Sequence, residues 1–95
     1  MINFALIGCG RVAPRHAQSI GQLHETRLVA TADIRFERAR RFGEQYHADA
    51  YEDYHEMLTR PDVQAVSVCV PSGLHAQVAI DALQAGKHVL VEKPI

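Results

Sequence analysis

Short runs of residues that are apolar on both faces are the feature that most limits how this chain can fold. Such runs span residues 2–7, 28–34, 65–70 and 88–91. A strand with one solvent-exposed face alternates apolar and polar residues, whereas a strand buried between two helical layers is apolar throughout. The runs therefore predict a parallel sheet covered on both sides. A short further strand is expected near Ala50 and Tyr51.

Segments with helical periodicity separate these runs. Apolar residues recur at helical spacing over 13–23, 36–46 and 76–83. Asp53 begins a capping box for a short helix that runs through Leu58. This alternation predicts an α/β fold, because right-handed crossovers between the strands give a doubly wound parallel sheet of the Rossmann type. The expected strand order is 3-2-1-4-5.

Length, composition and charge fit one packed domain over residues 1–95, since 47% of the residues are hydrophobic. The chain stops after the fifth expected strand, so we expect a sheet truncated before a sixth strand. A net charge of −1 lacks the basic signature of a nucleic-acid or anionic-membrane binder. No apolar run indicates a signal peptide or a membrane span. We therefore expect a cytoplasmic protein with no nucleic-acid or membrane partner.

The most specific motif follows the first apolar run. Residues 8–13 read Gly-Cys-Gly-Arg-Val-Ala, which fits the G-x-G-x-x-G/A turn that binds a dinucleotide pyrophosphate at a helix start. Gly8 permits the tight turn, Gly10 lets the backbone approach the phosphates, and Ala13 allows close helix packing. The loop residues expected to bind the cofactor are Gly8, Cys9, Gly10, Arg11 and Val12. The alternative is a glycine turn that holds no ligand.

An acidic residue, Asp33, follows this loop at the spacing of about 20 residues that dinucleotide sites use. Its carboxylate can accept hydrogen bonds from both ribose hydroxyls of an adenosine and would repel a 2′-phosphate. The sequence therefore favours NAD over NADP. Arg35 leaves NADP possible, because its guanidinium could lie over the adenine or meet a 2′-phosphate. It could equally be a solvated residue. With Ile34, these residues form the expected adenosine end of the site.

Two further clusters follow the fourth and fifth strands, where a doubly wound sheet binds ligands. Pro71, Ser72 and His75 are expected near the nicotinamide, although Ser72 could simply cap a helix and His75 could stabilise its first turn. Glu92 and Lys93 follow the last run. A lysine beside an oxidised nicotinamide is suited to bind or relay the proton of a substrate hydroxyl. A charged pair that merely ends a strand is the alternative.

Neither the histidines nor the cysteines follow a metal-binding pattern. The six histidines lack clustered ligand spacing, and Cys9 and Cys69 lack CxxC spacing. We therefore expect no metal site and two reduced thiols.

Together the motifs resemble the amino-terminal cofactor domain of the Gfo/Idh/MocA oxidoreductases, the glucose-fructose oxidoreductase and inositol dehydrogenase family. The likeness rests on residues 5–11 with His16, 32–34, 70–72 with His75, and the run 85–94. The resemblance implies NAD(P)-dependent hydride transfer at a hydroxyl carbon of a sugar, sugar nucleotide or cyclitol. Lys93 matches the catalytic lysine of the family.

The resemblance also implies a part that this chain lacks. Family members carry a second, mostly antiparallel domain that supplies the substrate pocket, and we expect this carboxy-terminal substrate domain to be absent here. The parent protein would then be a dehydrogenase acting on a sugar-like small molecule, while residues 1–95 alone would be inactive. The open edge of the fifth strand predicts a homo-oligomer. The alternative is a non-catalytic dinucleotide-binding sensor or regulatory module, as one fungal repressor of the family is.

Overall fold

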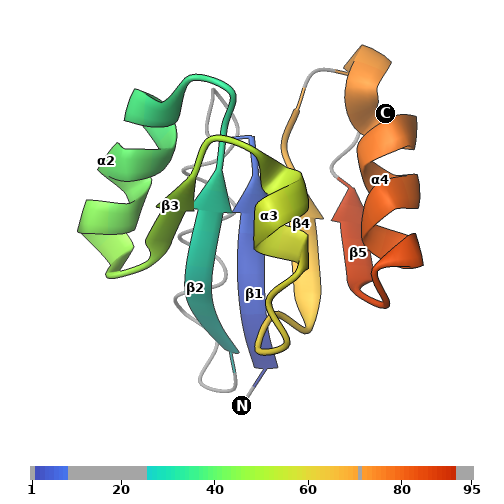
Figure 1. The fold of residues 1–95 in the computed structure, drawn as a ribbon, viewed down its shortest axis with the longest axis horizontal. Coiled ribbons are helices and arrows are strands. Elements are labelled where there is room, and N and C mark those ends of the chain that lie inside the picture. Colours follow the sequence, from blue (N-terminus) through green and yellow to red (C-terminus); the bar gives the residue numbers. More distant parts are fainter. Residues whose placement is uncertain (1, 9–25, 71, 92–95) are drawn as a thin grey trace.

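The computed structural model describes residues 2–8, 26–70 and 72–91, which form a parallel α/β sheet with helices against it (Figure 1). The sheet has five strands in the order β3-β2-β1-β4-β5, and all four neighbouring pairs are parallel. The predicted fold class and strand order are therefore confirmed. The predicted helix over 13–23 lies outside the described residues.

The strands coincide with the apolar runs except that one strand begins two residues earlier, and two strands end two residues earlier, than predicted. They are β1 (Ile2–Ile7), β2 (Thr26–Ala32), β3 (Asp49–Tyr51), β4 (Ala65–Val68) and β5 (His88–Val91). The prediction that β2 extends to residue 34 is wrong, because the Asp33 side chain accepts a hydrogen bond from the Arg35 N–H and turns the chain. β4 also ends before the predicted residue 70.

Helices cover both faces of the sheet, and the side chains of β1 show how. The helical segments are α2 (Phe36–Tyr46), α3 (Tyr54–Leu58), the 3-10 turn η1 (Ser72–Leu74) and α4 (His75–Gln84). Phe4 and Leu6 pack with Phe42 of α2 on one face. Ala5 and Ile7 belong to the core that α3 and α4 cover on the other face. The apolar pattern of β1 thus reflects burial on both sides, as predicted.

The edge of the sheet and the length of the helices concern two further expectations, oligomerisation and the absence of a membrane span. β5 lies at one edge of the described sheet, and oligomerisation through that edge stays a prediction. Among residues 2–8, 26–70 and 72–91, no helix combines the length and apolar character needed to cross a membrane.

Gly43 lies where α2 approaches the segment that leads into β3. A Cβ at this position would lie 2.5 Å from the carbonyl oxygen of Ala48, which is part of the backbone. Replacing glycine by alanine inside a helix normally stabilises it by about 1 kcal/mol. We expect the opposite sign here: Gly43→Ala should lower the free energy of unfolding by about 1–3 kcal/mol, because the added methyl forces the two segments apart. Urea denaturation measures the change.

Gly73→Ala is the matched control, since a Cβ at Gly73 would meet no atom within 4 Å. We expect no loss of stability for this variant. Equal losses in both variants would show that the close approach at Gly43 is not the cause.

Candidate functional site

The carboxyl ends of β1, β2 and β4 meet at one edge of the sheet, at the arrowheads in Figure 1. Backbone hydrogen bonds continue the ladders past the strand ends, from the Gly8 N–H to the Ala32 oxygen at 2.7 Å and from the Cys69 N–H to the Ile7 oxygen at 2.8 Å. Gly8 and Asp33 therefore follow neighbouring strands at the same edge. This is the edge at which doubly wound folds bind their ligands.

Gly8 is a position that only glycine can fill. Its φ is +91°, in the region that side chains disfavour. A Cβ there would lie 2.8 Å from the carbonyl carbon of Cys69 and 2.9 Å from the nitrogen of Val70. The backbone of Gly8 thus lies directly against the end of β4. Contact between Gly8 and a cofactor stays a prediction.

Asp33 is half-buried just after β2, and both its side chain and its backbone N–H form hydrogen bonds. Its Oδ1 accepts a hydrogen bond from the Arg35 N–H at 2.8 Å, and its N–H donates to the Tyr51 oxygen of β3 at 3.1 Å. Ile34 and Arg35 are exposed beyond it, and Ile34 is 83% exposed although it is apolar. The turn therefore fixes the carboxylate at the strand end and directs the next two side chains toward solvent.

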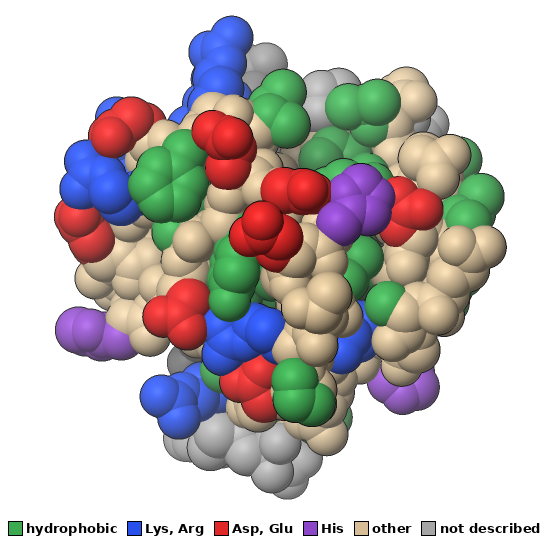
Figure 2. All heavy atoms as spheres, viewed as in Figure 1, with side chains coloured by type: hydrophobic (Ala, Val, Ile, Leu, Met, Phe, Trp, Pro, Cys, Tyr) green, Lys and Arg blue, Asp and Glu red, His purple; other side chains and the backbone are tan. Residues whose placement is uncertain are grey.

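A hollow of about 360 Å³ lies beside this turn. It is lined by Ile34, Glu52, Asp53, Tyr54 and His55. The lining consists of one aliphatic side chain, two aromatic rings and two carboxylates. The rings of Tyr54 and His55 are stacked, with their centroids 4.2 Å apart. Figure 2 shows acidic side chains gathered on this face of the molecule. The lining thus offers both apolar surface and hydrogen-bond acceptors.

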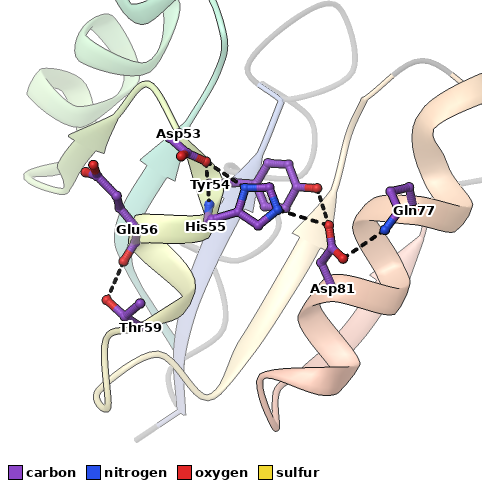
Figure 3. A network of polar contacts seen from close by, with 7 residues as sticks. All are labelled: Asp53, Tyr54, His55, Glu56, Thr59, Gln77 and Asp81. Atoms are coloured by element: carbon purple, nitrogen blue, oxygen red, sulfur yellow. Dashed lines mark hydrogen bonds and ion pairs between the residues drawn. The ribbon is translucent and has the colours of Figure 1, made fainter.

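Asp53, Tyr54 and His55 of this lining belong to a polar network that joins the start of α3 to α4 (Figure 3). Tyr54 Oη donates to Oδ2 of Asp81, and Gln77 Nε2 donates to Oδ1 of the same carboxylate at 2.9 Å. The His55 ring lies between two carboxylates, with Nδ1 2.8 Å from Asp53 Oδ1 and Nε2 3.2 Å from Asp81 Oδ2. The sequence predicted the cap at Asp53 but not this network.

The network shifts the pKa values of its members. The hydrogen bond with Asp53 raises the pKa of His55 above its usual value. The backbone N–H of His55 lowers the pKa of the Asp53 carboxyl, and the hydrogen bond from Tyr54 lowers that of Asp81. Burial, followed by the hydrogen bond to Asp81, raises the pKa of the Tyr54 phenol to about 12. The two carboxylates are thus held in their charged form.

Seven of the residues predicted to form the site lie outside the described residues: Cys9, Gly10, Arg11, Val12, Pro71, Glu92 and Lys93. The structure gives the backbone of Ser72, which begins η1, and of His75, which begins α4. Both therefore follow β4 at the same edge as Gly8 and Asp33. Cys69 is buried, and no group of three or more potential metal ligands occurs within the described segments.

A family profile matches nearly the whole chain. It covers residues 2–95 and is described as the Gfo/Idh/MocA oxidoreductase family, NAD-binding Rossmann fold.

Individual relatives agree with this profile. A dTDP-3,4-didehydro-2,6-dideoxy-alpha-D-glucose 3-reductase from Actinomadura kijaniata is 42% identical, and a myo-inositol 2-dehydrogenase from Thermotoga maritima is 35% identical. Both alignments cover 99% of this chain but only 29% and 28% of the relatives, so the chain spans less than a third of their length. The solved structure of a 3-ketoreductase from Actinomadura kijaniata in complex with NADP and TDP-benzene superposes with a TM-score of 0.91 at 42% identity, covering 98% of this chain and 29% of that one.

The Tyr54 phenol provides a direct test of the network. We expect one tyrosine to ionise near pH 12 in an ultraviolet titration, and Tyr54→Phe should remove that step. Because the folded state favours the neutral phenol, the stability that it contributes is complete below pH 10 and is lost as the pH rises toward 12. Asp81→Asn is the matched control and should shift the step to lower pH. An unchanged high-pH step in Tyr54→Phe would contradict the assignment.

Proposed function

The chain belongs to the Gfo/Idh/MocA oxidoreductase family, and from this premise we propose that it is the NAD(P)-binding part of a dehydrogenase. The parent enzyme transfers hydride between the cofactor and a hydroxyl carbon of a sugar, sugar nucleotide or cyclitol. The observation that carries the proposal is the joint position of Gly8 and Asp33 at neighbouring strand ends. The names of the relatives, which act on a deoxysugar nucleotide and on myo-inositol, support the substrate class.

The residues at the pyrophosphate end fit a dinucleotide. Gly8 follows β1 at the carboxyl edge of the sheet, and its positive φ of +91° suits the tight turn with which the glycine motif brings the backbone toward phosphates. Gly10, Arg11 and Val12 are the further residues that we propose to contact the phosphates. The bound cofactor supplies the nicotinamide ring that accepts or donates the hydride.

The residues at the adenosine end fit as well. The turn that Asp33 forms with the Arg35 N–H holds its carboxylate at the strand end, where it can accept hydrogen bonds from ribose hydroxyls. The exposed Ile34 and the ring of Tyr54 offer apolar surface round the neighbouring hollow. A solvent-facing isoleucine beside a hollow is explained by a flat adenine ring that covers it. Glu52 or Asp53 can accept a hydrogen bond from the amino group of that ring.

We propose NAD as the preferred cofactor, with NADP as the second candidate. The negative charge of Asp33 lies where a 2′-phosphate would approach, and its repulsion favours NAD. The similar 3-ketoreductase structure, however, holds NADP. The exposed Arg35, two residues beyond Asp33, is the side chain that could neutralise a 2′-phosphate.

Calorimetric titration of residues 1–95 with NAD⁺ and NADP⁺ tests both proposals. Asp33→Asn keeps an oxygen that can accept from the Arg35 N–H but removes the charge. We expect this variant to bind NAD⁺ about tenfold more weakly, since hydrogen bonds to charged groups contribute about 1.5–3 kcal/mol. Its affinity for NADP⁺ should be unchanged or higher.

Arg35→Ala is the complementary variant and should weaken only NADP⁺ binding. Equal effects of Asp33→Asn on the two cofactors would remove Asp33 as the residue that discriminates between them. The absence of binding by either cofactor would contradict the proposed function.

Lys93 is proposed as the residue that holds or relays the proton of the substrate hydroxyl. In the full-length protein, we expect Lys93→Ala to lower kcat by at least about 100-fold, the usual contribution of a general acid or base, with little change in cofactor affinity. Steady-state kinetics and cofactor titration measure the two quantities. Lys87→Ala is the matched control, because Lys87 Nζ donates to the Arg60 carbonyl oxygen before β5 begins. Unchanged turnover in Lys93→Ala would remove the lysine from the mechanism.

A further inference from the structure

The contacts of His55 with two carboxylates place a condition on its protonation. An ionised carboxylate accepts hydrogen bonds and donates none, whereas a neutral imidazole carries a single N–H. Nδ1 faces Asp53 at 2.8 Å and Nε2 faces Asp81 at 3.2 Å. Both contacts are therefore hydrogen bonds only when the ring carries two protons. In the neutral ring, one nitrogen lone pair faces a carboxylate oxygen.

The contact between His55 and Asp81 joins two helices (Figure 3). His55 and Tyr54 begin α3, a helix of five residues, and Asp81 lies on α4. Two hydrogen bonds, called ties below, join the helices, and Asp81 Oδ2 takes part in both. The hydroxyl of Tyr54 forms one of them and the His55 ring forms the other. The Tyr54 tie persists at neutral pH, because burial raises the pKa of its phenol to about 12. Only the His55 tie responds to pH near neutrality.

The charges round His55 favour its protonated form. Among the described residues, the titratable groups in contact with it are Asp53 before its own helix, Tyr54 within that helix and Asp81 from α4, and Glu52 lines the same hollow. Three of these four are carboxylates. The hydrogen bond with Asp53 raises the pKa of His55, in agreement with this arrangement.

We propose that His55 is a pH-dependent latch between α3 and α4. As an imidazolium it bridges Asp53 and Asp81 and holds the start of α3 in place, and on losing a proton it releases one carboxylate. Because Tyr54 and His55 also line the hollow beside Ile34, the latch controls how firmly the adenosine end of the site is held. This last step rests on the proposed cofactor-binding function.

The direction of the pH dependence follows from the shifted groups. The pKa of His55 is raised above its usual 6.5, so the stabilisation is complete below pH 6.5 and is lost as the pH rises through the raised value. The pKa values of Asp53 and Asp81 are lowered from 3.8, so their charges persist down to about that pH. The latch is therefore closed between about pH 4 and 6.5 and opens at higher pH. His55 is 61% exposed, so the effect is expected to be modest.

Amide hydrogen exchange between pH 5.5 and 8.5 tests the latch itself. The reporters are the N–H groups of His55 and Glu56, which donate to the side chain and the carbonyl oxygen of Asp53. After correction for intrinsic exchange rates, we expect their protection to fall about two- to fivefold as the pH rises, the range for an exposed ion pair. His55→Gln should abolish the dependence, because its amide does not titrate. His47→Asn, at an exposed histidine that ends α2, should leave it unchanged.

Protection that does not vary with pH in the unmodified protein would overturn the latch. So would a dependence that persists in His55→Gln, because another group would then be responsible.

The dissociation constant of NAD⁺ over the same pH range tests the link to the site. NAD⁺ is used because the 2′-phosphate of NADP⁺ titrates in this range. We expect affinity to fall about two- to fivefold from pH 5.5 to 8.5 in the unmodified protein and in His47→Asn, but not in His55→Gln. If amide hydrogen exchange varies with pH but the affinity for NAD⁺ stays constant, the link between the latch and the cofactor site is overturned. If NAD⁺ fails to bind at every pH, the proposed function fails, and the exchange experiment still decides the latch.

Discussion

β1 lies between β2 and β4, and its side chains alternate between two hydrophobic cores. Phe4 and Leu6 face α2, while Ala5 and Ile7 face α3 and α4. A shift of one residue in the pairing would exchange the two sets at once, so burial on both faces fixes the register. Ile7 is consequently level with Ala32 and Val68. The same register brings the turn after β1 level with the ends of the neighbouring strands, and the site depends on it.

Local patterns predicted the elements well where burial alone decides their bounds. α2 begins and ends where the periodicity indicates, and β1 and β5 coincide with their apolar runs. The end of β2 was misplaced because Ile34 is apolar yet 83% exposed. Hydropathy cannot separate an apolar residue in a strand from one turned outward by the side chain of Asp33. The error lies at the site, where exposure of apolar surface is useful to a binding protein.

The candidate site was predictable only where its residues are close in sequence or have a fixed spacing. The glycine loop and Asp33 form such a pattern, whereas Tyr54 and Asp81 are 27 positions apart. The sequence shows Asp53 as a helix cap and gives no local signal that His55 will meet α4. One weak signal exists: Gln77 and Asp81 are polar residues four apart within residues 76–83 of α4, whose other members are apolar. It indicates a polar neighbour without identifying it.

The two ends of the proposed cofactor site differ in how firmly the fold holds them. At the phosphate end, the backbone of Gly8 lies against that of Cys69 where two paired strands end, so a shift of Gly8 would disturb the pairing of β1 with β4. At the adenosine end, the hollow is formed partly by α3, whose five residues are too few to be helical on their own. α3 keeps its place through buried Met57 and Leu58 and through its ties to Asp81. Local opening is easiest in such weakly held elements, so changes in binding that leave the phosphate loop intact are expected to begin at α3.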